Sequence, residues 1–235
     1  MRAFVLFCTI LLGCLVAGAL LAYPAYLLAH AIDPDWRFHR VASRVAMLLL
    51  VIALIWLFRH LHVNDRVSLG YNLDRRSFLR WCGLALGLGA GMMLPVVGLL
   101  YALDVRVLHP KVEPTLALVG SLVFQGLLTG LAVAFLEETL LRGAVYTAIE
   151  RESGPRTAVL LTALVYSALH FLNKTRIPHD QVDWSSGLDL LSGALGSFAN
   201  PLALADSFLA LFAVGVLLGL VRLRTGNIAA CIGLH

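Results

Sequence analysis

The 235-residue chain is 60% hydrophobic and 14% charged, with a mean hydropathy of +0.85. Soluble domains carry about 25% charged residues, so this chain has too few polar groups to cover a water-facing surface of its size. A disordered chain is excluded because disorder requires low hydrophobicity. The formal net charge of +4 comes from basic residues that flank apolar runs, and we expect no nucleic-acid partner.

Runs of about 20 apolar residues predict membrane-spanning helices. In chain order, the six predicted spans cover residues 3–29, 41–58, 81–103, a stretch within 115–149, 156–173 and 203–221. The first run is too long for the ~7–15 residues of a signal-peptide core; cleavage after Ala17-Gly18-Ala19 is the alternative. A seventh helix begins near Asn227 and stops at His235, so we expect it to be truncated.

The segment between the fifth and sixth spans, residues 174–200, is the longest polar stretch. Within it, residues 187–198 are apolar but rich in Gly and Ser, which favours an interfacial or re-entrant helix, and Pro201 is expected to start the sixth span. The fold class predicted is therefore all-α, a polytopic membrane helix bundle with about six full spans and a truncated seventh. We divide the chain into N-terminal transmembrane helices, residues 1–114, and a C-terminal core, residues 115–235.

Two further patterns concern how these helices sit in the membrane. More Lys and Arg residues lie on the side that contains Arg2 than on the other, which predicts a cytoplasmic N-terminus and a multi-pass location in a membrane, expected to be a bacterial inner membrane. Glycines four residues apart predict closely packed helices. These are Gly83, Gly87 and Gly91; Gly126 and Gly130; and Gly215 and Gly219.

Ionisable residues interrupt the apolar runs at three places. Glu137, Glu138 and Arg142 lie in the fourth run, His170 in the fifth and His235 in the last. Such groups are costly at membrane depth and indicate a functional site by default. Measured from the cytoplasmic ends of their helices, Glu137 lies about 20 Å deep and His170 about 21 Å deep, so both could meet His235 in one intramembrane cavity.

The two adjacent glutamates are expected to have different roles. Glu138 and Arg142 are four residues apart on one helical face, where they can form an ion pair. Glu137 has no local cation, and apolar surroundings would suit it to accept and return a proton. Alternatively, both glutamates mark a helix end in the lipid headgroups, and His170 is a packing residue. A zinc site made of Glu137, His170 and His235 also stays open, although the sequence has no HExxH motif.

These residues fall into three motifs. Glu137 to Arg142 reads EExxxR, Tyr166 to His170 reads aromatic-xxx-His, and Gly226-Asn227-Ile228 leads to His235. In order and spacing the set resembles the CPBP family (CAAX proteases and bacteriocin-processing proteins, Abi-type), which are glutamate-type intramembrane endopeptidases. The family often has Phe where this chain has Tyr166, and the asparagine expected four residues after His235 would fall beyond the end of the chain.

The resemblance implies a role for each matching residue. Glu137 would activate the attacking water, His170 would help to hold it, and His235 would stabilise the oxyanion, as the three catalytic residues. Glu138 and Arg142 would be structural, with Tyr166 lining the site, and the scheme requires no metal or other cofactor.

The predicted function is that of an intramembrane endopeptidase that cleaves membrane-attached, hydrophobic or lipid-modified peptides, with the lipid bilayer as its surroundings. The alternatives are a non-catalytic scaffold or bacteriocin immunity protein on the same fold, a zinc-dependent membrane hydrolase, and a proton-coupled carrier that uses Glu137.

Overall fold

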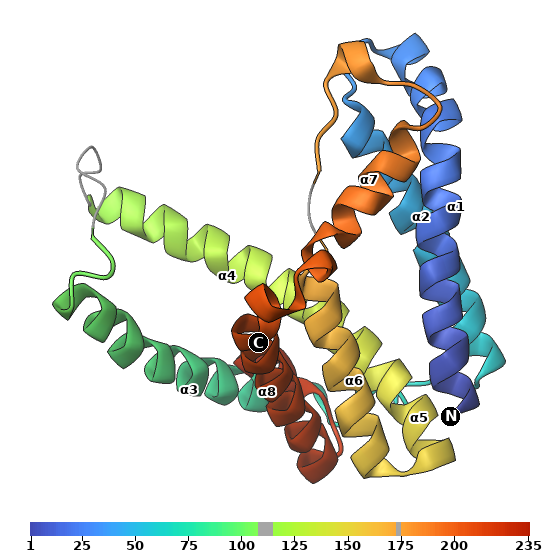
Figure 1. The fold of residues 1–235 in the computed structure, drawn as a ribbon. Coiled ribbons are helices and arrows are strands. Elements are labelled where there is room, and N and C mark those ends of the chain that lie inside the picture. The colour runs from blue at the N-terminus through green and yellow to red at the C-terminus, as the bar shows by residue number, and fades with distance from the viewer. Residues whose placement is uncertain (108–114, 173–174) are drawn as a thin grey trace. The chain divides into compact units, whose positions relative to one another are not determined.

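The structure is a computed structural model that describes residues 1–107, 115–172 and 175–235 (Figure 1). Helices account for all the regular secondary structure of this part of the chain. The α-helices are α1 (Arg2–Ile32), α2 (Phe38–His60), α3 (Arg75–Ala102), α4 (Leu116–Glu138), α5 (Tyr146–Ser153), α6 (Pro155–His170), α7 (Ser186–Leu195), α8 (Pro201–Thr225) and α9 (Ala229–Leu234). A π-helix, η1 (Thr139–Val145), and two 3-10 helices, η2 (His179–Gln181) and η3 (Gly196–Ala199), complete the set.

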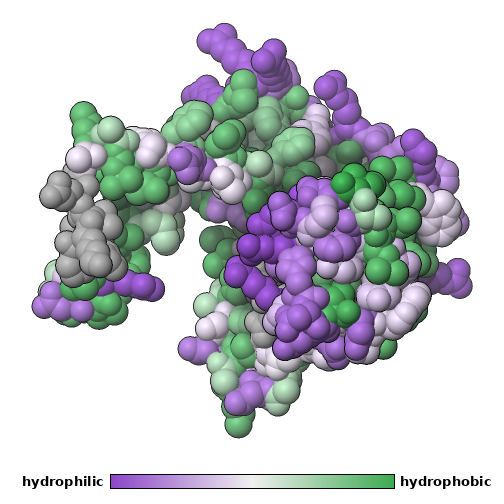
Figure 2. Space-filling model, turned by 90° about the horizontal axis from the view of Figure 1, so that it is seen from above, coloured by the Kyte–Doolittle hydropathy of each residue, from purple (hydrophilic) through white to green (hydrophobic). Residues whose placement is uncertain are grey.

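Five helices are long and apolar enough to cross a membrane. They are α1, α2, α3, α8 and the continuous helix from Leu116 to Ser153, which contains α4, η1 and α5. Large apolar side chains lie on the outside of these helices, and Figure 2 shows hydrophobic residues over much of the surface. Lipid is the solvent in which such a surface is stable. The protein is an integral membrane protein, as its composition predicts.

Helix α6 is the shortest of the six predicted spans. It has 16 residues, which gives a length of about 24 Å at 1.5 Å per residue, less than the ~30 Å hydrocarbon core. The predicted span ran to residue 173, which lies outside the described residues, whereas α6 ends at His170. The short helix predicted between the fifth and sixth spans is present as α7 and η3, and α8 begins at Pro201 as expected.

Local sequence sets several of these helix boundaries. The Asp74 carboxylate caps the start of α3 by accepting a hydrogen bond from the Ser77 amide at 3.0 Å, and the Thr115 hydroxyl accepts one from the Leu118 amide at the start of α4. Gly154 separates α5 from α6 with a φ of +81°, a conformation that favours glycine. Pro155 then occupies the first turn of α6, where its missing amide hydrogen costs nothing.

The chain forms two compact units, each drawn from two stretches of sequence. The first contains residues 1–64 and 145–217. In it, α1 and α2 lie side by side (Figure 1) around a core of Ala22, Tyr26, Phe38, Val41 and Ala42. Helix α7 packs against α1, and α5 packs against α6.

The second unit contains residues 65–144 and 218–235 and carries the acidic motif. Helix α9 packs against α3 and α4. Ala134, Ile228 and Ile232 form the core, with Tyr71, Phe78 and Cys82 packed against it. The division of the chain into residues 1–114 and 115–235 stays a prediction.

The glycine pattern explains only part of the helix packing. A methyl group at Gly215 would lie 2.9 Å from the Cα atom of Ala163, so α8 approaches α6 closely there, as predicted. At Gly83, Gly87, Gly91, Gly126 and Gly130, in contrast, an added methyl group would meet no described atom within 4 Å. The prediction of close packing is wrong at these five positions, because these faces of α3 and α4 contact no other described helix of the second unit.

Candidate active site

The acidic motif lies where an α-helix changes into a π-helix. Helix α4 ends at Glu138 and η1 begins at Thr139, so Arg142 belongs to the π segment. The Thr139 hydroxyl donates a hydrogen bond to the carbonyl of Phe135 at 2.5 Å. The Tyr71 hydroxyl lies 2.5 Å from the same Thr139 oxygen. Hydroxyls that bond backward to a carbonyl bend helices, and π segments inside α-helices often occur at functional sites.

Glu138 and Arg142 form a fully buried ion pair. The Nη1 atom of Arg142 lies 3.0 Å from Oε1 of Glu138, and both side chains are 0% exposed. The predicted pair is therefore present. A buried charge is tolerated only when it is paired. The pairing therefore explains why both charged residues can be buried in apolar surroundings.

His235 lies between the two glutamates. Its Nδ1 atom is 2.8 Å from Oε1 of Glu138, and its Nε2 atom is 3.9 Å from Oε2 of Glu137. An ionised carboxylate only accepts hydrogen bonds, so Nδ1 carries the proton that faces Glu138. In the neutral imidazole, Nε2 then presents its lone pair on the side of Glu137.

The turn between α8 and α9 positions His235. The Asn227 side chain accepts a hydrogen bond from the Ala229 amide at 3.0 Å and donates one to the Thr225 carbonyl at 3.0 Å. The Ile228 amide donates to the carbonyl of Gly70. At the other end of α9, Gly233 lies directly against the Cys82 carbonyl of α3, with no room for a side chain. These contacts fix both ends of the short helix that presents His235.

A second buried arginine supports the motif from α8. The Nε atom of Arg222 donates a hydrogen bond to the carbonyl of Arg142 at 3.0 Å, and Arg222 is 7% exposed. This carbonyl lies in the π segment, where the regular α-helical bonding pattern is interrupted. The basic residues at the end of the sixth predicted span have the pattern of charges at the membrane surface, so no sequence signal indicates that Arg222 is buried.

Glu137 is the accessible carboxylate of the motif. Its side chain is 34% exposed, whereas that of Glu138 is 0% exposed. Glu138 uses one oxygen, Oε1, for both Arg142 and His235. Its other oxygen, Oε2, is buried and has no hydrogen-bond partner among the described residues. Of the two acids, only Glu137 can present its carboxylate to a water molecule and a substrate.

His170 and Tyr166 belong to the other unit, on the last turn of α6. The Nδ1 atom of His170 lies 2.8 Å from the carbonyl oxygen of Tyr166, and the two ring centroids are 4.4 Å apart. Because a carbonyl accepts, Nδ1 carries the proton and Nε2 holds the lone pair in the neutral ring. That His170 meets Glu137 stays a prediction.

The structure thus brings together Glu137, Glu138, Arg142 and His235 in one unit. The contact of His235 with Glu138 was not expected, because the sequence indicated only the pairing of Glu138 with Arg142. Among the residues that the structure describes, no group of three or more His, Cys, Asp or Glu residues is arranged to hold a metal ion.

Comparison with known proteins adds one finding. Residues 119–235 match the family model described as "Type II CAAX prenyl endopeptidase Rce1-like". No curated protein and no solved structure matches the chain. The matched region contains all three motifs and every residue of the candidate site except those that approach it from α3 and the preceding loop, and it confirms the resemblance to CAAX proteases.

Proposed function

Because the chain belongs, through residues 119–235, to the Rce1-like family of type II CAAX prenyl endopeptidases, we propose that it is an intramembrane endopeptidase in which Glu137 activates the attacking water. The family supports a membrane protease in general. The mechanism and the substrate, a hydrophobic or lipid-modified peptide, are our proposal. The observation that carries it is the unequal environment of two adjacent glutamates, one accessible and one fully buried.

Glu137 acts as the general base. It takes a proton from a water molecule while the water oxygen attacks the carbonyl carbon of the peptide bond, which gives a tetrahedral oxyanion. Glu137 then returns this proton to the amide nitrogen as the carbon–nitrogen bond breaks, and an amine and a carboxylic acid are released. A base of this kind must be accessible to the water that it activates. The partly exposed Glu137 meets this condition, and the fully buried Glu138 does not.

The two histidines support this reaction. The bond from Nδ1 of His170 to Tyr166 leaves Nε2 as the atom that can hold the water. His235 faces Glu137 through its Nε2 atom at 3.9 Å, and protonation there would turn it into a donor for the oxyanion.

Cleavage of a prenylated CAAX peptide by the purified protein in liposomes tests the proposal. We expect Glu137→Gln to abolish cleavage, because the amide cannot take the proton, and to leave thermal unfolding unchanged, because Glu137 is not part of the buried pair. Asp104→Asn, on the α3–α4 connection, is the matched control and should retain full activity. Full cleavage by Glu137→Gln would refute the role of Glu137.

Each alternative function predicts a different experimental result. A scaffold or immunity protein would give no cleavage and a phenotype that Glu137→Gln does not change. A zinc-dependent hydrolase would lose activity on chelation and regain it with added zinc. A proton-coupled carrier would take up solute into proteoliposomes without cleaving any peptide.

The orientation is also part of the proposal. The excess of basic residues on the side of Arg2 places the N-terminus in the cytoplasm, of a bacterial inner membrane. Reporter fusions at the N-terminus and in the segment 180–185 would then report opposite sides of the membrane. Reporters on the same side would contradict this topology.

A further inference from the structure

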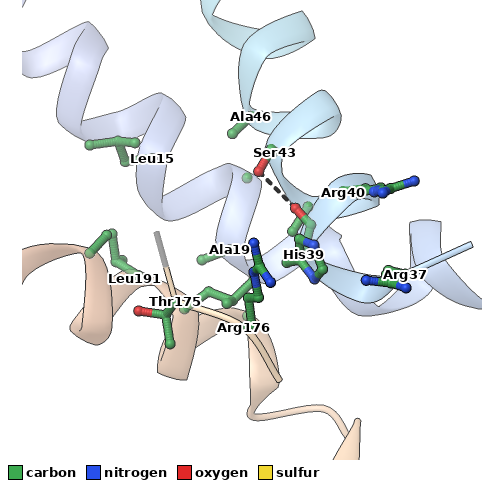
Figure 3. Close-up of a pocket in the computed structure, with 15 residues that line it drawn as sticks. Leu15, Ala19, Arg37, His39, Arg40, Ser43, Ala46, Thr175, Arg176 and Leu191 are labelled. Carbon is green, nitrogen blue, oxygen red and sulfur yellow. Dashed lines mark hydrogen bonds between the residues drawn. The ribbon is translucent and has the colours of Figure 1, made fainter. Parts of the chain in front are cut away.

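The first unit contains a cavity with a basic end and an apolar end. It measures about 440 Å³ and lies among α1, the start of α2, α7 and the segment that precedes α7. In Figure 3 the basic side chains of Arg37, Arg40 and Arg176 lie on one side, together with His39, and the apolar side chains lie on the other. The apolar residues labelled there are Leu15, Ala19 and Leu191, and Leu190 and Ala194 also line the cavity.

The basic end has no counter-charge of its own. None of the described residues that line this cavity is acidic, and Arg37, Arg40 and Arg176 form no ion pair with another described residue. An adjoining cavity of about 700 Å³ shares Arg37, His39 and Arg176 and adds a single acid, Asp35. The Nδ1 atom of His39 is buried and has no hydrogen-bond partner among the described residues. Three arginines thus line a cavity that has no acidic residue among its described lining residues.

The depth of the cavity indicates what kind of anion fits. Arg37 precedes the first turn of α2, a membrane-spanning helix, and Ala46 lines the cavity nine positions further on. At 1.5 Å per residue this is a distance of about 13 Å into the apolar part of the helix. A small hydrophilic anion would occupy only the basic end. An amphiphile with a phosphate head and an acyl chain matches both ends.

We propose that this cavity binds an anionic phospholipid, with the phosphate between Arg37, Arg40 and Arg176 and an acyl chain along the apolar residues of α1 and α7. Arginine suits this role because its planar guanidinium group binds phosphate oxygens through two hydrogen bonds at once. Basic pockets between membrane helices bind lipid headgroups by the same chemistry. The occupied site would join α7 to α1 and α2, since all three helices line the cavity.

Native mass spectrometry of the delipidated protein with added lipid tests the site. We expect phosphatidylglycerol to bind and phosphatidylcholine, whose headgroup has no net charge, to bind at least about tenfold more weakly. The double substitution Arg37→Gln with Arg176→Gln should weaken phosphatidylglycerol binding about tenfold or more. Arg44→Gln is the matched control. Arg44 lies one turn beyond Arg40 on α2, over the Trp36 ring at 4.6 Å from its centroid, and does not line the cavity.

A variant at an apolar lining residue keeps the test independent of charge. Ala194→Phe, on α7, should fill part of the cavity and weaken binding of the lipid but not of inorganic phosphate. Glu137→Gln should bind phosphatidylglycerol like the parent protein. The lipid site is therefore tested independently of the proposed peptidase activity. Equal binding of the two lipids, an equal loss with Arg44→Gln, or displacement of phosphatidylglycerol by millimolar inorganic phosphate would overturn the proposal.

Discussion

The Nδ1 atom of His235 lies 2.8 Å from the Oε1 atom of Glu138, the oxygen that also receives the Arg142 guanidinium group at 3.0 Å. One buried carboxylate oxygen therefore fixes both an arginine of its own helix and a histidine from the end of the chain. Glu138 therefore links the EExxxR motif to His235 of the third motif, although Glu137 is the accessible acid.

The first prediction concerns the buried ion pair. Glu138→Gln leaves Arg142 charged and buried without its carboxylate, so we expect the free energy of unfolding in detergent to fall by about 3–5 kcal/mol. The double substitution Glu138→Gln with Arg142→Met removes both charges and should recover a substantial part of this loss. Thermal unfolding of the three proteins measures the effect, and a double variant no more stable than the single one would contradict it.

The second prediction uses the contact between α9 and α3. Gly233→Ala places a methyl group against the Cys82 carbonyl and within 2.8 Å of the Ala85 Cβ atom. Because neither neighbour is a flexible side chain, α9 must shift, at a cost of about 1–3 kcal/mol. We expect a large loss of peptidase activity because His235 follows directly.

Gly91→Ala is the control for this substitution. It lies within α3, and an added methyl group there meets no described atom within 4 Å. Alanine is the better helix former, so unfolding should shift slightly toward higher temperature. If Gly233→Ala behaves like Gly91→Ala in both assays, α9 does not depend on this close approach.

The third prediction tests Arg222 as a positioning residue. Arg222→Gln removes the hydrogen bond from Nε to the Arg142 carbonyl, and a bond from a charged donor contributes about 1.5–3 kcal/mol. We expect kcat to fall while KM changes little, because Arg222 contacts the π segment and not the accessible carboxylate. Arg224→Gln, an exposed arginine two residues further along α8, should leave both constants unchanged; a similar loss in both variants would point to surface charge instead.

The fourth prediction is a pH dependence outside the membrane. The Ser68 hydroxyl and amide both donate to the Asp65 carboxylate, and these bonds hold the pKa of Asp65 below its ordinary value of 3.8. A lowered folded pKa stabilises the protein above the ordinary pKa, and this stabilisation disappears as the pH falls through the folded value. The loop that Asp65 orders places Leu69 against Gly143 of the π segment.

Asp65→Ala and Asp65→Asn separate charge from hydrogen bonding. We expect Asp65→Ala to unfold at a lower temperature at pH 7 and to lose less stability than the parent protein on acidification below pH ~4. Asp65→Asn keeps an oxygen that can accept the Ser68 amide and should lie between the two at pH 7. The interpretation fails if the parent protein and Asp65→Ala show the same acid dependence.

The parts of the structure that the sequence predicted are those set by spacing along one helix. The separation of four residues between Glu138 and Arg142 was sufficient to predict their ion pair. Apolar run lengths were sufficient to predict five helices that are long and apolar enough to cross a membrane. The sequence also predicts that His235 lies near the acidic motif, and its Nε2 atom is 3.9 Å from Oε2 of Glu137.

Features that depend on contacts between distant segments could not be predicted in the same way. Arg222 has the sequence context of an interfacial arginine, yet it is buried beside Gly70 and bonded to the Arg142 carbonyl, two segments that are distant in the sequence. The preference of His235 for Glu138 depends on how α9 packs against α3. The glycines of α3 and α4 carry a packing pattern, yet most of these positions face outward, because spacing does not tell whether a partner helix is present.

The π segment makes the site sensitive to insertions and deletions as well as to substitutions. Loss of a single residue between Glu138 and Arg142, such as Leu140, would turn everything that follows by about 100° around the helix axis. The guanidinium group would then leave the carboxylate with no change in the chemistry of either side chain. Chains that share this site should therefore keep the number of residues between these two positions constant, because the ion pair depends on that spacing.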